Sequence, residues 1–118
     1  MASFSKYQKG LLAVKSKIDE NIASHTTIKE LALIAGVSES KLKILFQSEY
    51  GKSIYTYLKD KRIIEAKRLL ADTSIPLKDI ATITGFQFYT NFVTFFTKHT
   101  NKAPLKYRKS ARKSIKNS

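Results

Sequence analysis

The sequence predicts an all-α protein of about seven helices, and three observations support this fold class. Apolar residues recur at three- and four-residue spacing through most of the 118-residue chain, which is the pattern of amphipathic helices. No segment alternates apolar and polar residues in the way that half-buried strands do. The chain has only four glycines and two prolines, and most of them lie between helical segments, where they can end one helix or begin the next.

The first three helices are predicted from apolar spacing and from the residues beside it. An apolar stripe predicts a helix over about 8–23. Thr27 can cap a second helix that ends at Gly36, and Ser38 can cap a third that ends near Gly51. The stripe of the first helix consists of Leu11, Val14, Ile18 and Ile22.

Four more helices complete the chain. Ser53 can cap a long fourth helix that runs to about Ala71. Ser74 can cap a fifth helix, which ends at Gly85. The aromatic run after this glycine forms the sixth helix, and Pro104 opens a short seventh.

The charge of the chain is large and unevenly distributed. The formal net charge is +13, and all nine acidic residues lie between Asp19 and Asp79. From Ile80 onward there are eight lysines or arginines and no acidic residue. A field of one sign attracts polyanions, chiefly nucleic acid. The C-terminal part of the sequence has no basic amphipathic helix with a wide apolar face, so we expect no binding to a membrane surface.

Several classes of chemistry lack the residues they need. The absence of cysteine excludes disulfides, thiolate metal sites and thiol nucleophiles. His25 and His99 are far apart and have no paired carboxylates, and no glycine-rich phosphate loop is present. We therefore expect no metal, no cofactor and no enzymatic activity. No signal-like segment and no apolar run of about 20 residues occurs, so we expect an intracellular protein.

A repeat connects the two halves of the chain. The segment "IKELALIAGVS" at 28–38 is similar to "LKDIATITGFQ" at 77–87, with an offset of 49 residues. The following segments "KLKILF" at 41–46 and "NFVTFF" at 91–96 match with an offset of 50. Two copies of a helix, a glycine turn and a second helix, joined by a long helix, predict two lobes.

Each copy has the pattern of a helix-turn-helix motif. The small Ala32 and Ala81 let the two helices of a copy approach closely, and Gly36 and Gly85 can adopt the positive φ that ends the first helix sharply. The second helix then projects outward, where it can enter a DNA major groove. Two copies in one basic chain indicate DNA binding more strongly than one copy would.

Over about residues 8–109 the chain resembles the DNA-binding domain of AraC/XylS-type bacterial transcription regulators. The family pattern contains a Gly-x-Ser turn, Tyr-Leu-x-x-x-Arg-apolar-x-x-Ala-x-x-Leu-Leu, Ile-Ala-x-x-x-Gly-Phe, Phe-x-x-x-Phe and a closing Pro-x-x-Tyr-Arg. The matching residues are Gly36, Ser38, Leu42, Phe46, Tyr57, Leu58, Arg62, Ile63, Ala66, Leu69, Leu70, Ile80, Ala81, Gly85, Phe86, Phe92, Phe96, Pro104, Tyr107 and Arg108.

Three departures from the family pattern bear on function. Ile44 and Thr94 stand where the family often has arginine in the second helix of each motif. Guanine reading by arginine is therefore not carried over to either position. Asn101 stands where the family usually has glycine, and asparagine tolerates a left-handed turn.

The resemblance also implies how the chain is divided. We expect a first helix-turn-helix lobe over 8–52, a linker helix over 53–72 and a second lobe over 73–109. The remaining basic segment, 110–118, is expected to be a disordered tail.

The resemblance places two sets of residues toward DNA. Helical geometry puts one face of each second helix opposite its apolar face, and this outward face is the one that the family presents to bases. The expected base-facing residues are Ser40, Lys43, Ile44, Tyr89, Thr90, Asn91 and Thr94. The expected phosphate-facing residues are Lys41, Lys52, Lys98, Lys106 and Arg108.

The aromatic run of the sixth helix divides into two groups. Phe92, Phe95 and Phe96 share one helical face and are expected in the core. Phe88 and Tyr89 have no counterpart in the core of the first copy. For Phe88 two interpretations stay open: packing onto the start of the helix, or contact with thymine methyl groups or sugars of DNA.

We therefore expect a sequence-specific duplex-DNA-binding domain of a bacterial AraC-type transcription regulator that reads two successive major grooves. The resemblance implies a cytoplasmic, monomeric domain that is nucleoid-associated when bound, and RNA polymerase is a further partner that it leaves open. The alternatives are a basic helical RNA-binding module and a helical nuclease. Competition between duplex DNA and duplex RNA distinguishes the RNA-binding module from the DNA-binding domain. Metal-dependent cleavage of nucleic acid would indicate the nuclease.

Overall fold

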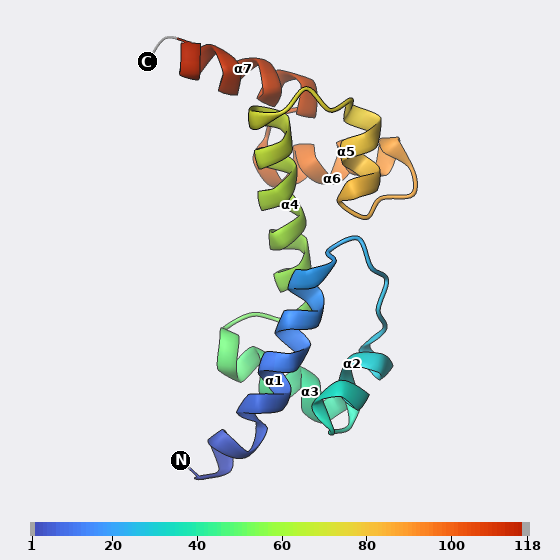
Figure 1. Cartoon of the computed structure of the whole chain (residues 1–118), viewed down its shortest axis with the longest axis vertical. Helices are drawn as coiled ribbons and strands as arrows, with labels where there is room; N and C mark the ends of the chain where they lie inside the picture. The colour runs from blue at the N-terminus through green and yellow to red at the C-terminus, as the bar shows by residue number, and fades with distance from the viewer. Residues whose placement is uncertain (1, 117–118) are drawn as a thin grey trace. The chain divides into compact units, whose positions relative to one another are not determined.

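The computed structural model describes residues 2–116 of the chain, and side chains for residues 6–113. Every regular element in this range is an α-helix, so the predicted all-α fold is confirmed (Figure 1). The chain divides after Lys59 into two compact units, which we call the N-terminal unit and the C-terminal unit. The helices are α1 (Ala2–Glu20), α2 (Ile28–Ala35), α3 (Glu39–Tyr50), α4 (Ile54–Asp72), α5 (Leu77–Ile83), α6 (Tyr89–Thr100) and α7 (Pro104–Lys116).

The N-terminal unit has a mainly aliphatic core between α1, α2, α3 and the start of α4. Leu11, Val14 and Ile18 of the predicted stripe are buried in this core, whereas Ile22 lies in the turn after α1 and is half-buried. Phe46 is the largest fully buried side chain of the unit. The two first helices approach closely at Gly10, where an added Cβ would lie 2.7 Å from the backbone oxygen of Ala35. The buried residues are Leu11, Val14, Ile18, Leu31, Ala32, Leu42, Phe46, Ile54 and Tyr57.

The buried cluster of the C-terminal unit combines six aliphatic residues with Phe92 and Phe96, and further aromatic rings pack on it. Phe92 and Phe96 are fully buried, with ring centroids 5.8 Å apart, and Tyr107 from α7 contacts Phe96 edge-on at 5.4 Å. Phe86 covers the same cluster and lies 5.0 Å from the partly buried Phe95. The expected core placement of the Phe92, Phe95 and Phe96 face is therefore confirmed.

The two helix-turn-helix turns are closed by the same pair of backbone bonds. In the N-terminal unit the Val37 amide donates to the Ala32 carbonyl at 3.1 Å and the Gly36 amide donates to Leu33. In the C-terminal unit the Phe86 amide donates to the Ala81 carbonyl at 2.9 Å, and the Gly85 amide donates to the Thr82 carbonyl. Both glycines have positive φ, 71° and 98°, as the sequence predicts.

Three of the four predicted caps are present. Thr27 forms a reciprocal capping box with Glu30, whose amide donates to the threonine hydroxyl at 3.1 Å. Ser38 accepts from the Lys41 amide at 3.2 Å, and Ser53 accepts from Thr56 at 3.1 Å.

The fourth expected cap, Ser74, is wrong. Pro76 occupies the N-cap position of α5, and its carbonyl accepts from the amides of Asp79 and Ile80, both at 3.0 Å. Proline disfavours the α conformation at the residue before it, so the helix cannot begin at Ile75 and starts after Pro76, two residues later than expected.

Both ends of the chain differ from the expected helix limits. The first helix begins at Ala2 and ends at Glu20, instead of covering 8–23. The last helix continues to Lys116, so residues 110–116 are helical and the expected disordered tail is corrected over this range; the rest of that tail lies outside the described residues. No glycine or proline follows Pro104 to end the helix, and Arg112 anchors its second half by donating to the carbonyl of Thr73.

Candidate nucleic-acid interface

The outward face of α3 carries the first group of candidate base-reading side chains. Leu42 and Phe46 are buried beneath this helix and fix its rotation about its own axis. Ser40, Lys43 and Ile44 are consequently exposed to solvent, Ile44 to 70%. The structure therefore brings the expected α3 residues together on one open surface.

The outward face of α6 carries the second group. Thr90, Asn91 and Thr94 are exposed on this helix, and the Thr94 hydroxyl donates to the Thr90 carbonyl at 3.1 Å. Tyr89 differs from them, because its ring is partly buried and lies 6.5 Å from the ring of Phe92. The α6 surface is therefore polar and neutral, with Tyr89 at its packed edge.

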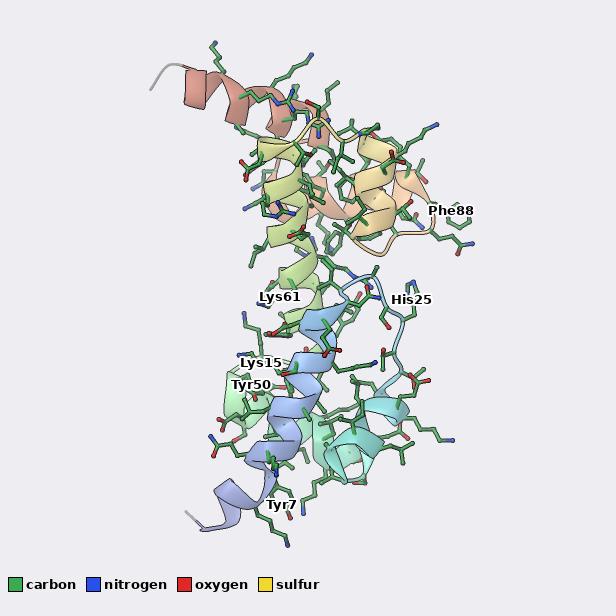
Figure 2. The ribbon with its side chains drawn as sticks, viewed as in Figure 1. Tyr7, Lys15, His25, Tyr50, Lys61 and Phe88 are labelled. Atoms are coloured by element: carbon green, nitrogen blue, oxygen red, sulfur yellow. The ribbon has the colours of Figure 1, made fainter. Side chains whose placement is uncertain are left out.

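Phe88 occupies the N-cap position of α6 and does not pack into the unit. Its backbone is extended, with φ −116° and ψ 131°, and no side chain caps the helix. The ring is 57% exposed and belongs neither to the buried cluster of the C-terminal unit nor to the side chains packed on it. Figure 2 shows the side chain directed away from the ribbon. The structure thus disfavours packing, one of the two interpretations of this residue.

The expected phosphate-facing lysines have different surroundings. Lys98 and Lys106 are exposed, whereas Lys52 is half-buried and takes part in interactions within the protein. The Lys41 ammonium donates to the Tyr7 hydroxyl and lies 4.3 Å from the centroid of the Tyr7 ring. That hydrogen bond lowers the pKa of the Tyr7 hydroxyl. Lys41 therefore links α3 to α1 in addition to contributing positive charge.

Arg108 has a structural position instead of the expected phosphate-facing one. Its guanidinium donates to the carbonyl of Leu70 at 3.0 Å and to that of Ile75 at 2.7 Å, with a longer bond to Leu69. Burial, together with the nearby charge of Arg112, lowers the pKa of Arg108. The C-terminal carbonyls of a helix need such donors, so we remove Arg108 from the phosphate set.

Lysines in the turn before α7 and on α7 itself extend the basic surface beyond the residues that the sequence singled out. Lys102, Lys106 and Lys109 line one shallow groove together with Asn101 and Ser110. Only Lys106 of these was expected to face phosphate. Lys102 lies in the turn before α7, and the three-residue spacing of Lys106 and Lys109 places these two on one face of the helix, which was the only signal in the sequence.

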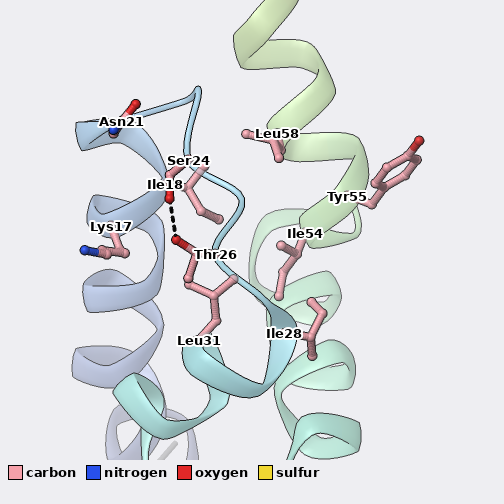
Figure 3. Close-up of a pocket in the computed structure, with 10 residues that line it drawn as sticks. All are labelled: Lys17, Ile18, Asn21, Ser24, Thr26, Ile28, Leu31, Ile54, Tyr55 and Leu58. Atoms are coloured by element: carbon pink, nitrogen blue, oxygen red, sulfur yellow. Dashed lines mark hydrogen bonds between the residues drawn. The ribbon is translucent and has the colours of Figure 1, made fainter. Parts of the chain in front are cut away.

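A separate cavity of about 200 Å³ lies within the N-terminal unit (Figure 3). Its walls are mostly apolar, and Ser24 and Thr26 at its edge share a hydrogen bond of 2.7 Å. Sites for small ligands usually measure roughly 300–1,000 Å³, so this cavity is small for a dedicated ligand site. It is lined by Lys17, Ile18, Asn21, Ser24, Thr26, Ile28, Leu31, Ile54, Tyr55 and Leu58.

No group of three or more histidine or acidic side chains in residues 2–116 is arranged to hold a metal ion. Within that range, no helix combines the length and the apolar character needed to cross a bilayer.

The fold and its two exposed helices define a class of protein, the double helix-turn-helix proteins. A family model described as a helix-turn-helix domain matches residues 31–110. The chain belongs to this family, in its AraC-type branch.

Curated relatives match over most of the chain but are longer than it. A helix-turn-helix-type transcriptional regulator of Bacillus subtilis, YobQ, is 33% identical over 103 residues, which cover 87% of the chain and 43% of the relative. The arabinose operon regulatory protein of Salmonella typhimurium is 33% identical over 92 residues, covering 77% and 33%. The chain therefore spans less than half the length of these two relatives.

Solved structures show the same fold. The C-terminal domain of the two-component response regulator yesN from Fusobacterium nucleatum is 31% identical, with a TM-score of 0.74, covering 80% of this chain and 93% of that one. The DNA-binding domain of AdpA, solved with a target DNA, has a TM-score of 0.84 at 22% identity, covering 92% and 98%. At this level of identity, the similarity to the AdpA domain shows that the two proteins share a fold.

Proposed function

We propose that the chain is the sequence-specific duplex-DNA-binding domain of a bacterial transcription regulator. The observation that carries this proposal is the repeated motif: α3 and α6 each follow a glycine turn closed by the same two backbone bonds and present an open, mostly polar face, in a chain of net charge +13. Each helix would read one major groove, and the two grooves would be successive ones on the duplex.

Different side chains would recognise the bases and bind the phosphates. Ser40 and Lys43 on α3, and Thr90 and Asn91 on α6, carry donors and acceptors at exposed positions that suit base edges. Lysines outside these faces would neutralise phosphates and supply sequence-independent affinity. The proposed phosphate set is Lys41, Lys52, Lys98 and Lys106 from the expected residues, with Lys102 and Lys109 added.

Duplex DNA fits these helices better than duplex RNA does. The major groove of A-form RNA is too deep and narrow for a helix, whereas that of B-DNA admits one. No chemistry is part of the proposal, and the domain would need neither metal nor cofactor. We also propose that it binds as a monomer in the cytoplasm, at the nucleoid, because one chain supplies two reading helices; transcription control supports RNA polymerase as a second partner.

Selection from a random duplex library tests the proposal directly. We expect a preferred site with two subsites, and affinity that falls by orders of magnitude between about 50 and 200 mM salt. A duplex RNA of the same sequence should compete poorly. Failure to enrich any sequence, or an affinity that is flat across the salt series, would contradict the proposal.

Matched variants then distinguish residues that recognise bases from residues that bind phosphates. Lys43→Ala and Asn91→Ala should change which bases are preferred, each costing about 1–3 kcal/mol of discrimination at its subsite. Lys106→Ala should weaken binding to all duplexes alike and lower the salt slope by about one. Lys29→Ala, an exposed lysine on α2, is the control. Unchanged preference in both of the first two variants would remove the assignment of the reading faces.

A further inference from the structure

Two exposed apolar side chains interrupt the otherwise polar reading surfaces, one in each unit. Ile44 is 70% exposed on α3, beside the exposed Lys43. Phe88 is 57% exposed immediately before α6, two residues from the exposed Thr90. Each surface thus combines hydrogen-bonding groups with one apolar group.

Phe88 is unfavourable for helix stability at the N-cap position of α6. The N-cap of a helix favours side chains that accept hydrogen bonds from the first turn, and Ser38 does this for the Lys41 amide at the start of α3. A phenylalanine at the same place in α6 offers no acceptor and exposes a large ring. A residue that breaks a local rule with no compensation inside the fold indicates a functional position.

Ile44 is also poorly suited to a solvated helix. β-branched side chains lose rotamer freedom in a helix and rank below the straight-chain residues there. Burial, which usually compensates for this loss, is missing at Ile44, while its neighbour Leu45 packs on the core. The choice is explained if Ile44 is buried when the domain binds its target.

One chemical group in the major groove matches these two side chains. Among the edges of the four base pairs in that groove, the apolar group is the C5-methyl of thymine. We infer that Ile44 and Phe88 each contact a thymine methyl, so that both subsites contain a thymine read by apolar contact. This inference rests on the proposed DNA-binding function and adds the base class that each subsite requires.

Replacing thymine by deoxyuridine removes the methyl and leaves base pairing intact, so it isolates the inferred contact. Each thymine of the selected duplex is replaced in turn, and the Kd is measured for the wild-type chain. We expect one thymine in each subsite at which the replacement weakens binding by about three- to tenfold. Replacement elsewhere in the duplex should change little.

Two variants assign each methyl to its side chain. Ile44→Ser should abolish the uridine penalty in one subsite and keep it in the other, and Phe88→Ser should do the reverse. Leu33→Ser, which removes a 75% exposed apolar side chain of α2 outside the reading surfaces, should keep both penalties. Circular dichroism checks that each variant keeps its helical content.

The outcomes distinguish this inference from the proposed function. Sequence-selective binding that tolerates uridine at every position would overturn the thymine inference and leave the proposed function standing. Penalties that persist in both serine variants would overturn the assignment to Ile44 and Phe88. A chain that selects no duplex sequence at all would overturn the proposed function, and this inference with it.

Discussion

The two units repeat one backbone motif with different side chains. Both turns are closed by the same two amide–carbonyl bonds and by a glycine of positive φ. The helix that follows the turn is capped by Ser38 in the N-terminal unit and preceded by Phe88 without a side-chain cap in the C-terminal unit. Both buried clusters are mainly aliphatic, but four partly buried aromatic rings pack on the C-terminal cluster and one, Tyr50, packs on the N-terminal cluster.

This difference shows which features the motif requires. The positive-φ glycine and the two inward residues of the second helix recur in both units, so the turn and the packing of that helix depend on them. The cap and the outward side chains do not recur, so the motif tolerates their change. The variable positions are therefore the ones at which the units can acquire different base preferences.

The largest effects are expected for the equivalent core residues Phe46 and Phe96. Both are fully buried, and Phe46 contacts the rings of Tyr50 and Tyr57 at 4.6 and 5.6 Å. Phe46→Ala and Phe96→Ala should each lower the free energy of unfolding by about 3–5 kcal/mol.

Amide hydrogen exchange checks whether the loss stays local. Each unit has its own buried cluster, so protection should fall mainly in the unit that carries the substitution. Equal loss of protection in both units, from either variant, would show that the two cores unfold as one.

Alanine substitutions at the two turn glycines should lower the free energy of unfolding by less than the core substitutions do, and by different amounts at the two positions. At Gly36 an added Cβ meets no atom within 4 Å, so Gly36→Ala should cost only the left-handed strain, about 1–2 kcal/mol. At Gly85 the same Cβ would lie 2.7 Å from the Arg62 guanidinium, which sits 5.7 Å from the Phe86 ring centroid. Gly85→Ala should therefore cost about 1 kcal/mol more.

Urea unfolding of the two alanine variants measures this difference. Arg62→Ala in the background of each variant is the control, because it should reduce the additional cost at Gly85 and leave the cost at Gly36 unchanged. Equal costs at the two glycines would show that Arg62 moves away freely.

Substitutions at the N-cap positions of α3 and α6 should change the free energy of unfolding in opposite directions. Ser38→Ala removes the acceptor for the Lys41 amide and should destabilise the chain by about 0.5–2 kcal/mol. Phe88→Ser adds an acceptor at the start of α6 and should stabilise it by a similar or smaller amount. Thermal unfolding measures both, and a destabilised Phe88→Ser chain would mean that the phenylalanine supports the fold.

The smallest effect concerns alkaline pH in the N-terminal unit. Burial, and then the hydrogen bond of 2.7 Å that Tyr57 donates to Asp19, raise the pKa of the Tyr57 hydroxyl. The folded chain keeps this proton above pH ~10, where the unfolded chain releases it. Stability is therefore fully present below pH ~10 and falls above it, by about 0.8 kcal/mol at half a pH unit higher.

Tyr57→Phe provides the control for this pH dependence. Its free energy of unfolding should lack this part of the fall between pH ~9.5 and ~10.5, although the lost hydrogen bond lowers its stability at neutral pH. Parallel curves for the two chains over this range would contradict the assignment to Tyr57.

The sequence by itself determined the helices, the repeat and the two buried faces. Apolar spacing and the glycines at 36, 51 and 85 act locally, through helix periodicity and backbone sterics, so they can be read without knowing what packs on what. Caps such as Thr27 are local in the same way. The outward faces of α3 and α6 followed from the inward ones, because a helix has a fixed rotation per residue.

Tertiary structure alone decided which charged and aromatic side chains remain available for a partner. Arg108 looked like a phosphate contact, and only the approach of α7 to the end of α4 brings it to the Leu70 carbonyl, 38 positions away in the chain. Phe88 was ambiguous because a ring beside a helix start can pack or project, and in the structure it is 57% exposed and lies outside the buried cluster of the C-terminal unit, which disfavours packing. Such outcomes depend on contacts between distant segments, which residue spacing within one helix does not encode.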